Sequence, residues 1–355
     1  MINKQSASPV LDRISAEEAL YLSQSDDLLS LGQQASAVRY AWNPEPVVTY
    51  VVDRNVNYTN ICNAGCTFCA FARHKSDSDS YVLEREDFIR KLDELVAVGG
   101  TQVLLQGGHN VALKLTFFED LFKFIKQSYP SLTLHALSPP EIAHLSRIEK
   151  MPILDVLQRL KAAGLDSIPG GGAEILVESV RKQLAAGKCS SVKWLEVMET
   201  AHSLGIQSSA TMMFGHIESW HDRIEHLEKL RQLQDQTGGF RAFICWTFQS
   251  AHTELGQVVK TSKGCYDYLK TLAISRIYLD NFPHVQVSWV TQGPKVGQIA
   301  LHFGGDDFGG TMMEENVVRS AGAHCHTNEE EVRALIRDAG FIPCKRNTEY
   351  QRLET

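Results

Sequence analysis

Three cysteines lie close together in the first fifth of the chain: Cys62, Cys66 and Cys69, at spacings of four and three residues. A short loop with these spacings can place three thiolates around one small inorganic centre. Four thiolates would complete a cubane cluster or a tetrahedral zinc site, whereas three leave one metal position open for a ligand that is not protein. The spacing therefore predicts chemistry at a metal centre. The alternatives are a zinc site completed by a distant residue, or three unrelated core thiols.

The elements that must position this loop follow a repeated pattern. Residues 47–52, directly upstream, form an apolar, β-branched run typical of a buried parallel strand. Amphipathic helical stretches and further apolar runs then alternate along the chain. The eight expected strands are 47–52, 101–105, 132–137, 165–168, 207–214, 241–248, 285–290 and 298–303. Eight strands alternating with helices predict a parallel sheet, and eight is the number that closes a barrel. We therefore expect an α/β fold, a (β/α)8 TIM-type barrel.

The chain divides into three expected parts. Residues 1–46 form an N-terminal helical extension, in which Ser15 and Glu18 make a capping-box pattern. Residues 47–320 form the barrel, and residues 321–355 form a C-terminal helical tail packed on it. The cysteines outside the loop are scattered, and we expect them to be ordinary reduced thiols: Cys189, Cys245, Cys265, Cys325 and Cys344.

Unusual residues gather in the loops that follow the strands, at the face where barrels of this type hold their active sites. Gly107 and Gly108 let the backbone approach a ligand closely, although a tight turn also uses glycine. His109 follows them directly. Glu174 follows three glycines and opens a helix; its carboxylate suits ribose hydroxyls or an ammonium better than a phosphate. The alternative for Glu174 is a helix-capping acid.

An acidic cluster is expected in and just after the loop of the eighth strand. Glycines flank Asp306 and Asp307 and constrain them above the barrel mouth. Carboxylates there could bind sugar hydroxyls or accept a proton, whereas a solvated run of charge is the alternative. The candidate proton acceptors are His109, Asp306, Asp307 and Glu315. Lys295, in the preceding loop, could meet a substrate carboxylate or remain solvated.

Composition narrows the class of partner. The chain has 355 residues, 43% hydrophobic and 22% charged, which is ordinary for a soluble globular protein. A net charge of -7 argues against a general nucleic-acid or anionic-membrane surface. The polar N-terminus has no apolar core like that of a signal peptide, and no run of eighteen apolar residues occurs. We therefore expect a cytoplasmic protein that acts on a small molecule, without nucleic acid or membrane.

The cysteine loop resembles the cluster loop of the radical S-adenosylmethionine (radical SAM) superfamily, and the resemblance extends over about residues 48–345. In that superfamily three cysteines hold a [4Fe-4S] cluster, whose fourth iron binds the amine and carboxylate of S-adenosylmethionine. The resemblance therefore implies a barrel of the radical SAM type, with Cys62, Cys66 and Cys69 as cluster ligands. It also implies a reduced flavodoxin or ferredoxin-type electron donor. The residues expected to bind the cofactor are Phe68, Gly107, Gly108, Ser138, Glu141, Glu174, His216 and Glu218.

Within the superfamily, residues 166–176 and 211–218 resemble the branch that serves futalosine-dependent menaquinone synthesis and deazaflavin synthesis. Residues 246–249, 288–295 and 306–316 are similar to the cyclases of that branch that act on dehypoxanthine futalosine. Such a cyclase uses a 5'-deoxyadenosyl radical to take the C4' hydrogen of the substrate ribose, and the carbon radical adds to the benzoate ring. The alternatives are an aminofutalosine synthase, half of a deazaflavin synthase, or a zinc-stabilised barrel that binds a ligand without chemistry.

The sixth loop departs from the branch pattern at two positions. Cys245 and Ser250 each stand where the branch pattern has proline. Proline restricts the backbone, so these departures could alter the shape of the loop. They do not touch the three cysteines of the cluster loop.

Overall fold

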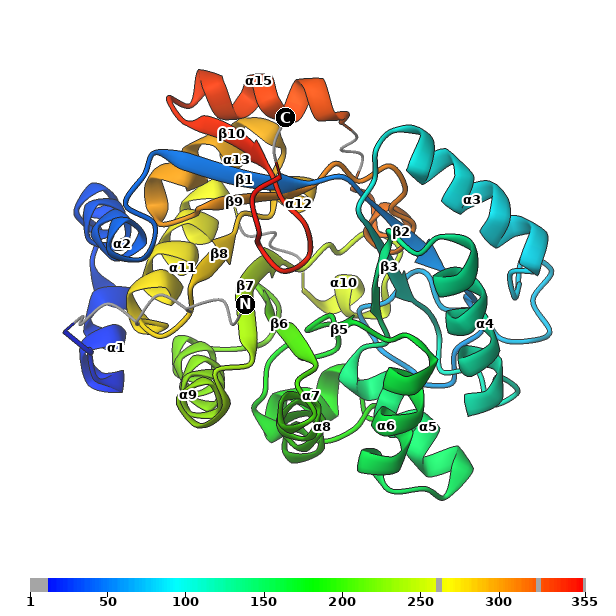
Figure 1. Cartoon of the computed structure of the whole chain (residues 1–355). Coiled ribbons are helices and arrows are strands. Elements are labelled where there is room, and N and C mark those ends of the chain that lie inside the picture. Colours follow the sequence, from blue (N-terminus) through cyan, green and yellow to red (C-terminus); the bar gives the residue numbers. More distant parts are fainter. Residues whose placement is uncertain (1–11, 260–263, 324–326, 354–355) are drawn as a thin grey trace.

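A curled sheet of ten parallel strands forms the centre of the protein, with helices packed around its outside (Figure 1). The computed structural model describes residues 12–259, 264–323 and 327–353. The sheet order is β10-β1-β9-β8-β7-β6-β5-β4-β3-β2. The strands are β1 (Val47–Val51), β2 (Asp53–Asn57), β3 (Gln102–Gln106), β4 (Thr133–Ala136), β5 (Ser167–Ile168), β6 (Gln207–Phe214), β7 (Phe240–Thr247), β8 (His284–Gln286), β9 (Asp307–Gly310) and β10 (Ile342–Lys345).

One extended run of chain closes this sheet into a barrel. Strands β1 and β2 are consecutive and are separated only by Val52. The first half of the run pairs with β9 and β10, and the second half pairs with β3, always in parallel. The same run therefore joins the two ends of the strand order. The expected α/β barrel is confirmed.

Most of the helices lie between successive strands in the chain and cover the outer face of the sheet (Figure 1). They are α1 (Ala16–Gln24), α2 (Leu28–Trp42), α3 (Arg85–Ala97), α4 (Leu115–Ser128), α5 (Pro139–Glu149), α6 (Ile153–Ala163), α7 (Glu178–Leu184), α8 (Ser191–Ser203), α9 (Trp220–Thr237), α10 (Glu254–Val258), α11 (Cys265–Tyr278), α12 (Trp289–Gln292), α13 (Pro294–Ala300), η1 (Leu301–Phe303), α14 (Val317–Ser320) and α15 (Glu329–Asp338). None of the helices in the described ranges is long and apolar enough to span a bilayer.

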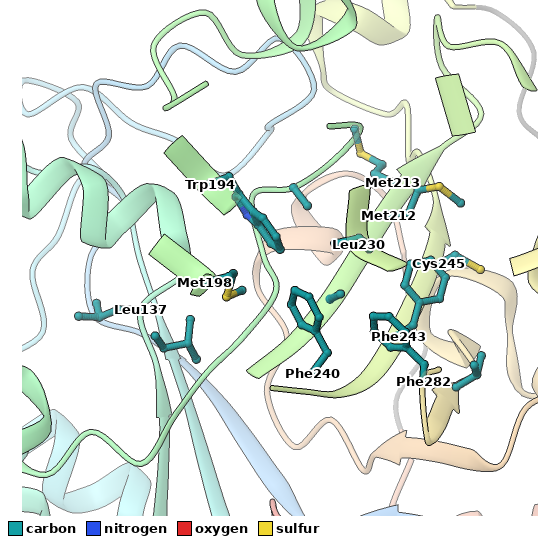
Figure 2. Packing of buried hydrophobic residues seen from close by; sticks show 14 of the residues in the cluster. Leu137, Trp194, Met198, Met212, Met213, Leu230, Phe240, Phe243, Cys245 and Phe282 are labelled. Atoms are coloured by element: carbon teal, nitrogen blue, oxygen red, sulfur yellow. The ribbon is translucent and has the colours of Figure 1, made fainter. Parts of the chain in front are cut away.

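The core lies between the outward side chains of the strands and the helices around them. Figure 2 shows part of it, where Trp194 of α8 and Phe282 lie on either side of Phe240 from β7. Phe240 stacks against Trp194 and Phe282 with ring centroids 6.4 and 5.4 Å apart. Burial of such large apolar side chains fixes the helices against the sheet. The inward faces of the strands are thereby left to form the site.

Helices α1 and α2 precede the first strand and pack against α9 and α11. The capping box is confirmed: the Ser15 side chain accepts from the Glu18 N–H, and the Glu18 carboxylate accepts from the Ser15 N–H. Arg39 of α2 is buried and donates to the carbonyls of Asn43, Glu45 and Val47. Those bonds fix the entry into β1. Residues 1–11 and Cys325, which entered the expectations above, lie outside the described residues.

The eighth strand was misplaced by the sequence analysis. Residues 298–303 are helical, in α13 and η1, because Pro294 at the first helical position starts a helix that runs through the apolar stretch. A short apolar run cannot be assigned to helix or strand by periodicity alone. The strand is instead β9, Asp307–Gly310, whose acidic and glycine-rich sequence looks like a loop but is fully buried.

Two further differences concern the later part of the chain. The expected strand over 285–290 is shorter, because β8 ends at Gln286 and α12 begins at Trp289. The C-terminal segment, expected as a helical tail, is helical only in α15. Strand β10 follows and pairs with β1. Residues 346–352 then form a turn, which is anchored to β1 because the Arg346 N–H donates to the Tyr50 carbonyl.

Candidate active site

A cavity of about 410 Å³ occupies the inside of the barrel. The cysteine loop and the loops after the strands line one end, at the carboxyl ends of the strands. Inward side chains of the strands, such as Asn55, Gln106 and Trp246, line the wall. Arg241, from the first part of β7, and Arg346, from the C-terminal turn, line the opposite end, which we call the floor. A ligand in this cavity can therefore extend from the cysteine loop toward the base of the barrel.

The cysteine loop is held in place by backbone bonds to distant segments. The Thr67 N–H donates to the Leu184 carbonyl at 2.9 Å, and the Leu255 N–H donates to the Thr67 carbonyl at 2.8 Å. Cys62, Cys66 and Cys69 are free thiols, and all three line the cavity. The loop therefore brings the three predicted ligands to the edge of one space.

Three free cysteine thiols at this end of the cavity are the donor type that binds an iron–sulfur cluster. Within the described part of the chain, no three His, Cys, Asp or Glu side chains converge closely enough to bind a single metal ion. An iron–sulfur cluster binds each cysteine at a different iron atom, so its ligands need not converge on one point. The His109 N–H also donates to the Cys62 sulfur at 3.3 Å, a type of bond that tunes cluster thiolates. The donor set fits a cluster of this kind.

Gly107 and Gly108 bring the next loop directly against the cysteine loop. A Cβ added at Gly108 would lie 2.2 Å from the Ile61 carbonyl oxygen, and one at Gly107 would lie 2.7 Å from the Tyr58 ring. No side chain fits at either position without moving the neighbouring chain. Both glycines line the cavity, so their role is close approach of backbone to the cluster end of the site.

Ser138 and Glu141 form the capping box at the start of α5 and also line the cavity. One oxygen of Glu141 accepts from the Tyr58 hydroxyl at 2.7 Å and from the Gly107 N–H at 3.0 Å. The other oxygen accepts from the Ser138 N–H at 2.7 Å. Burial raises the pKa of Glu141, and these donors oppose the rise. Glu141 therefore links the loop after β3, through Gly107, to the loop after β4, through Ser138.

Glu174 stands at the cavity wall with an unsatisfied oxygen. Its backbone is left-handed, at φ 44°, and its side chain is buried. One carboxylate oxygen accepts from the Lys188 ammonium at 2.9 Å; the other has no hydrogen-bond partner and lies 3.8 Å from the buried Arg181 guanidinium. A buried carboxylate oxygen without a donor is costly. A ribose hydroxyl or an ammonium of a ligand would satisfy it.

Lys188 was missed by the sequence analysis, because it lies between α7 and α8 and outside any loop that directly follows a strand. It lines the cavity, 5.2 Å from the centre of the Phe68 ring. Burial lowers the pKa of Lys188, but the neighbouring Cys66 and Glu174 outweigh that effect and raise it. Gly187 was the available signal, because a Cβ there would lie 2.3 Å from the Ala64 carbonyl oxygen in the cysteine loop.

His109 and Glu315, two of the candidate proton acceptors, both line the cavity. The His109 ring stacks on His144 with centroids 4.9 Å apart, and burial lowers its pKa to about 3. The ring is therefore neutral at physiological pH. The Glu315 carboxylate already accepts from the N–H groups of residues 317–319 at the start of α14, and burial raises its pKa.

The expectation that Asp306 and Asp307 lie above the barrel mouth is wrong. They fall at the start of β9, so they lie at the opposite end of the barrel, and neither lines the cavity. Asp306 accepts from the Val285 N–H at 2.7 Å and from Asn43 at 2.9 Å. Asp307 pairs with the Arg346 guanidinium through both of its oxygens. The misplaced eighth strand is the reason.

His216 and Glu218 also lie outside the cavity, although the loop after β6 carries them. Both side chains are fully buried. Glu218 accepts from the Gly215 N–H at 2.7 Å and pairs with the Arg223 guanidinium at 2.5 Å. Lys295 is exposed on α13 and is likewise absent from the cavity. These residues shape the loops and the surface, and the structure does not bring them to the site.

The floor contains residues that the sequence analysis did not select. Arg346, Thr348 and Tyr350 come from the C-terminal turn, and Arg241 comes from β7. The Tyr350 ring stacks on His284 with centroids 4.0 Å apart, and Arg346 lies 3.9 Å from the centre of the same ring. No local sequence signal marks this turn as part of the site, because its place depends on β10 joining the sheet.

Two family models match the chain. The model of the radical SAM superfamily matches residues 56–230, and the model of the CofH/MqnC C-terminal region matches residues 237–355. In overall structure the chain is similar to methylornithine synthase, with a TM-score of 0.75 over 94% of both chains. The two sequences are 15% identical, so this similarity is one of fold.

Three relatives are similar over nearly the whole chain. A cyclic dehypoxanthine futalosine synthase of Streptomyces coelicolor is 44% identical over 99% of this chain and 90% of its own length. A cyclic dehypoxanthine futalosine synthase of Halalkalibacterium halodurans is 42% identical over 97% of this chain and 92% of its own length. An aminodeoxyfutalosine synthase of Thermus thermophilus is 39% identical, over 96% and 92%.

Proposed function

This chain belongs to the CofH/MqnC family of the radical SAM superfamily, and we propose that it converts dehypoxanthine futalosine into cyclic dehypoxanthine futalosine. The observation that carries the proposal is the position of the three-thiol loop at one end of a deep barrel cavity. A reactive group formed at that end can meet a substrate that lies along the barrel. The similarity to two cyclases at 42% and 44% identity favours ring closure over the related reactions.

The residues present fit the two cofactors that we propose. Cys62, Cys66 and Cys69 would hold a [4Fe-4S] cluster, and the Glu174 carboxylate at the cavity wall would bind a hydroxyl or ammonium of S-adenosylmethionine. The backbone at Gly107–Gly108 would lie against the same ligand. When bound, these cofactors supply a 5'-deoxyadenosyl radical. A small reduced flavodoxin or ferredoxin is the electron donor that we propose.

The task of the protein is then mostly one of position. The substrate must be held so that one ribose hydrogen lies near the reacting carbon, at about 3 to 3.5 Å, while water is kept out. Trp246 and Trp289 line the cavity wall and provide rigid apolar surface for an aromatic substrate. The substrate would give one hydrogen atom to the adenosyl carbon, which leaves as 5'-deoxyadenosine, and after ring closure it would give one electron to the oxidised cluster and one proton to a base. The product is therefore two hydrogen atoms lighter than the substrate.

The proposal is tested by turnover of the whole chain after anaerobic reconstitution with iron and sulfide. Protein, reductant and S-adenosylmethionine are mixed with dehypoxanthine futalosine, and the products are separated and weighed by mass spectrometry. We expect a product two hydrogens lighter, together with one 5'-deoxyadenosine per product. Failure of this conversion, with turnover of an aminodeoxyfutalosine precursor instead, would assign the chain to the sister reaction. Zinc without iron after anaerobic isolation would favour a ligand-binding barrel.

A further inference from the structure

Arg241 is turned into the cavity by an irregularity of β7. Ser208 of β6 pairs with Phe240, but the next residue, Ser209, pairs with Ala242, so Arg241 is an extra residue in the ladder. Ile244 and Trp246 line the cavity, and Arg241 lies an odd number of positions before both. Strict alternation would point its side chain away from them. A β-bulge re-aims a side chain in this way and is common beside active sites.

The charge of Arg241 is poorly compensated. Its guanidinium donates to the Gln207 side-chain oxygen at 2.6 Å and to the Thr348 carbonyl at 3.1 Å, and both of these acceptors are neutral. The nearest carboxylate, Glu349, lies 3.8 Å away and is 57% exposed. Burial lowers the pKa of Arg241, and the Glu349 charge opposes that effect. A cation that is mostly buried beside a ligand cavity, as Arg241 is with 13% of its side chain exposed, is stabilised by an anion that arrives with the ligand.

The other cations that line the described cavity are already paired. Lys188, at the cysteine-loop end, contacts Glu174 at 2.9 Å. Arg346, at the floor, bonds both oxygens of the buried Asp307, with the Nη2 contact at 3.0 Å. Lys295, the residue expected to meet a substrate carboxylate, is exposed outside the cavity. Of these cations, Arg241 is therefore the one that lines the cavity and is available to bind a ligand carboxylate.

We propose that Arg241 binds the aryl carboxylate of the substrate at the floor of the barrel and thereby sets which end of the substrate faces the cysteine loop. This inference rests on the proposed function, because the proposed substrate is a benzoate. The carboxylate end lies at Arg241, near the start of β7, and the ribose end lies toward the carboxyl ends of the strands. A substrate held in the opposite direction would place its charge beside the buried Glu174 and its ribose away from the radical.

The test compares the free acid of dehypoxanthine futalosine with its methyl ester, which lacks the negative charge. Dissociation constants are measured by calorimetry on the full chain, and KM and kcat are measured on the reconstituted protein. For the wild type we expect the acid to bind at least about tenfold more tightly than the ester, as a charged hydrogen bond requires. In Arg241→Gln the acid should bind more weakly while binding of the ester stays unchanged, so the preference is lost. Arg241→Lys should recover part of the preference.

The control variant is Gln207→Ala, which removes a neutral partner of Arg241 and leaves the charge in place. It should keep the preference for the acid. An Arg241→Gln protein that still folds, as judged by its melting curve, and still prefers the acid as strongly as the wild type would overturn the inference. If wild-type protein neither binds nor converts the acid, the proposed function itself has failed. The two failures are therefore separate results.

Discussion

At the scale of single residues, Cys66 shows how the protein keeps a ligand thiol out of other chemistry. Burial raises its pKa to about 12, so the free side chain is a protonated thiol at neutral pH. A buried thiol of this kind is inert until a metal displaces its proton. Lys188 supplies positive charge that opposes the effect of burial on Cys66. The protonated thiol is therefore a poor target for oxidation at neutral pH.

The Cys66→Ala variant should lose the cluster. We expect about four iron atoms per chain in the reconstituted wild type and far fewer in the variant, with no 5'-deoxyadenosine formed. Iron analysis and the visible absorption spectrum measure the first result, and chromatography measures the second. Cys265→Ala, at an exposed position at the start of α11, is the matched control and should keep both iron and turnover. Retention of turnover in Cys66→Ala would refute the ligand assignment.

A second prediction at this scale concerns the unsatisfied oxygen of Glu174. Glu174→Gln keeps the size of the side chain but removes the carboxylate charge that we propose to contact S-adenosylmethionine. We expect KM for S-adenosylmethionine to rise by about tenfold or more, with iron content unchanged. Glu178→Gln is the control, because Glu178 accepts from Ser191 at 3.0 Å and does not line the cavity. It should lower the melting temperature without changing that KM, and equal KM values in the two variants would argue against cofactor contact.

At the scale of elements, the loop after β6 is a structural support for the site. Glu218 closes it by accepting from the Gly215 and His216 N–H groups, at 2.7 and 2.9 Å, and by pairing with Arg223 in α9. Burial alone would raise the pKa of Glu218, but His216, Arg223 and the backbone donors lower it to about 2. A carboxylate whose pKa falls on folding stabilises the folded state in its ionised form.

The loop should therefore weaken in acid. The pKa of Glu218 drops from 4.5 to about 2 on folding, so its contribution is complete above about pH 5 and is lost as the pH falls through 2. The shift corresponds to roughly 3 kcal/mol at neutral pH. Glu218→Gln should lower the unfolding free energy at pH 7 and flatten its decline between pH 5 and 2. Urea unfolding across that range measures both effects, and a slope equal to that of the wild type would contradict the assignment.

At the scale of the whole molecule, the two ends of the chain complete the barrel. Helices α1 and α2 cover one side of it, and β10 with the turn beyond it covers the base (Figure 1). Tyr350 fills part of the floor by stacking on His284 and by contact with Arg346. A carbon radical that meets a stray hydrogen donor is quenched before the ring closes. We therefore expect the C-terminal turn to limit the access of such donors to the cavity.

Removal of the Tyr350 ring should uncouple cofactor cleavage from product formation. We expect Tyr350→Ala to form 5'-deoxyadenosine in excess over cyclic product, whereas the wild type forms the two in equal amounts. Tyr21→Ala, which removes a 74% exposed ring from α1, should leave the ratio at that of the wild type. Quantitative mass spectrometry of both compounds gives the ratio. A ratio of one in Tyr350→Ala would show that the floor does not control access to the radical.

The sequence by itself determined the features that depend on local spacing. The separation of Cys62, Cys66 and Cys69, the capping box of Ser15 with Glu18, and the alternation of strands with helices are all contained in short windows. Because parallel strands expose their carboxyl ends on one side of a barrel, the alternation also places the cysteine loop, Gly107 and Glu174 at one end of a common cavity.

Only the tertiary structure decided what the rest of the cavity contains. Strand β9 was missed because its sequence is acidic and glycine-rich; Asp307 is stabilised there by Arg346, 39 residues further along the chain. Tyr350 reaches the cavity through a turn that local sequence does not mark, and Arg241 faces it because β7 has one extra residue opposite the step from Ser208 to Ser209 in β6. Such placements depend on pairing between distant segments, and no window of local sequence contains that information.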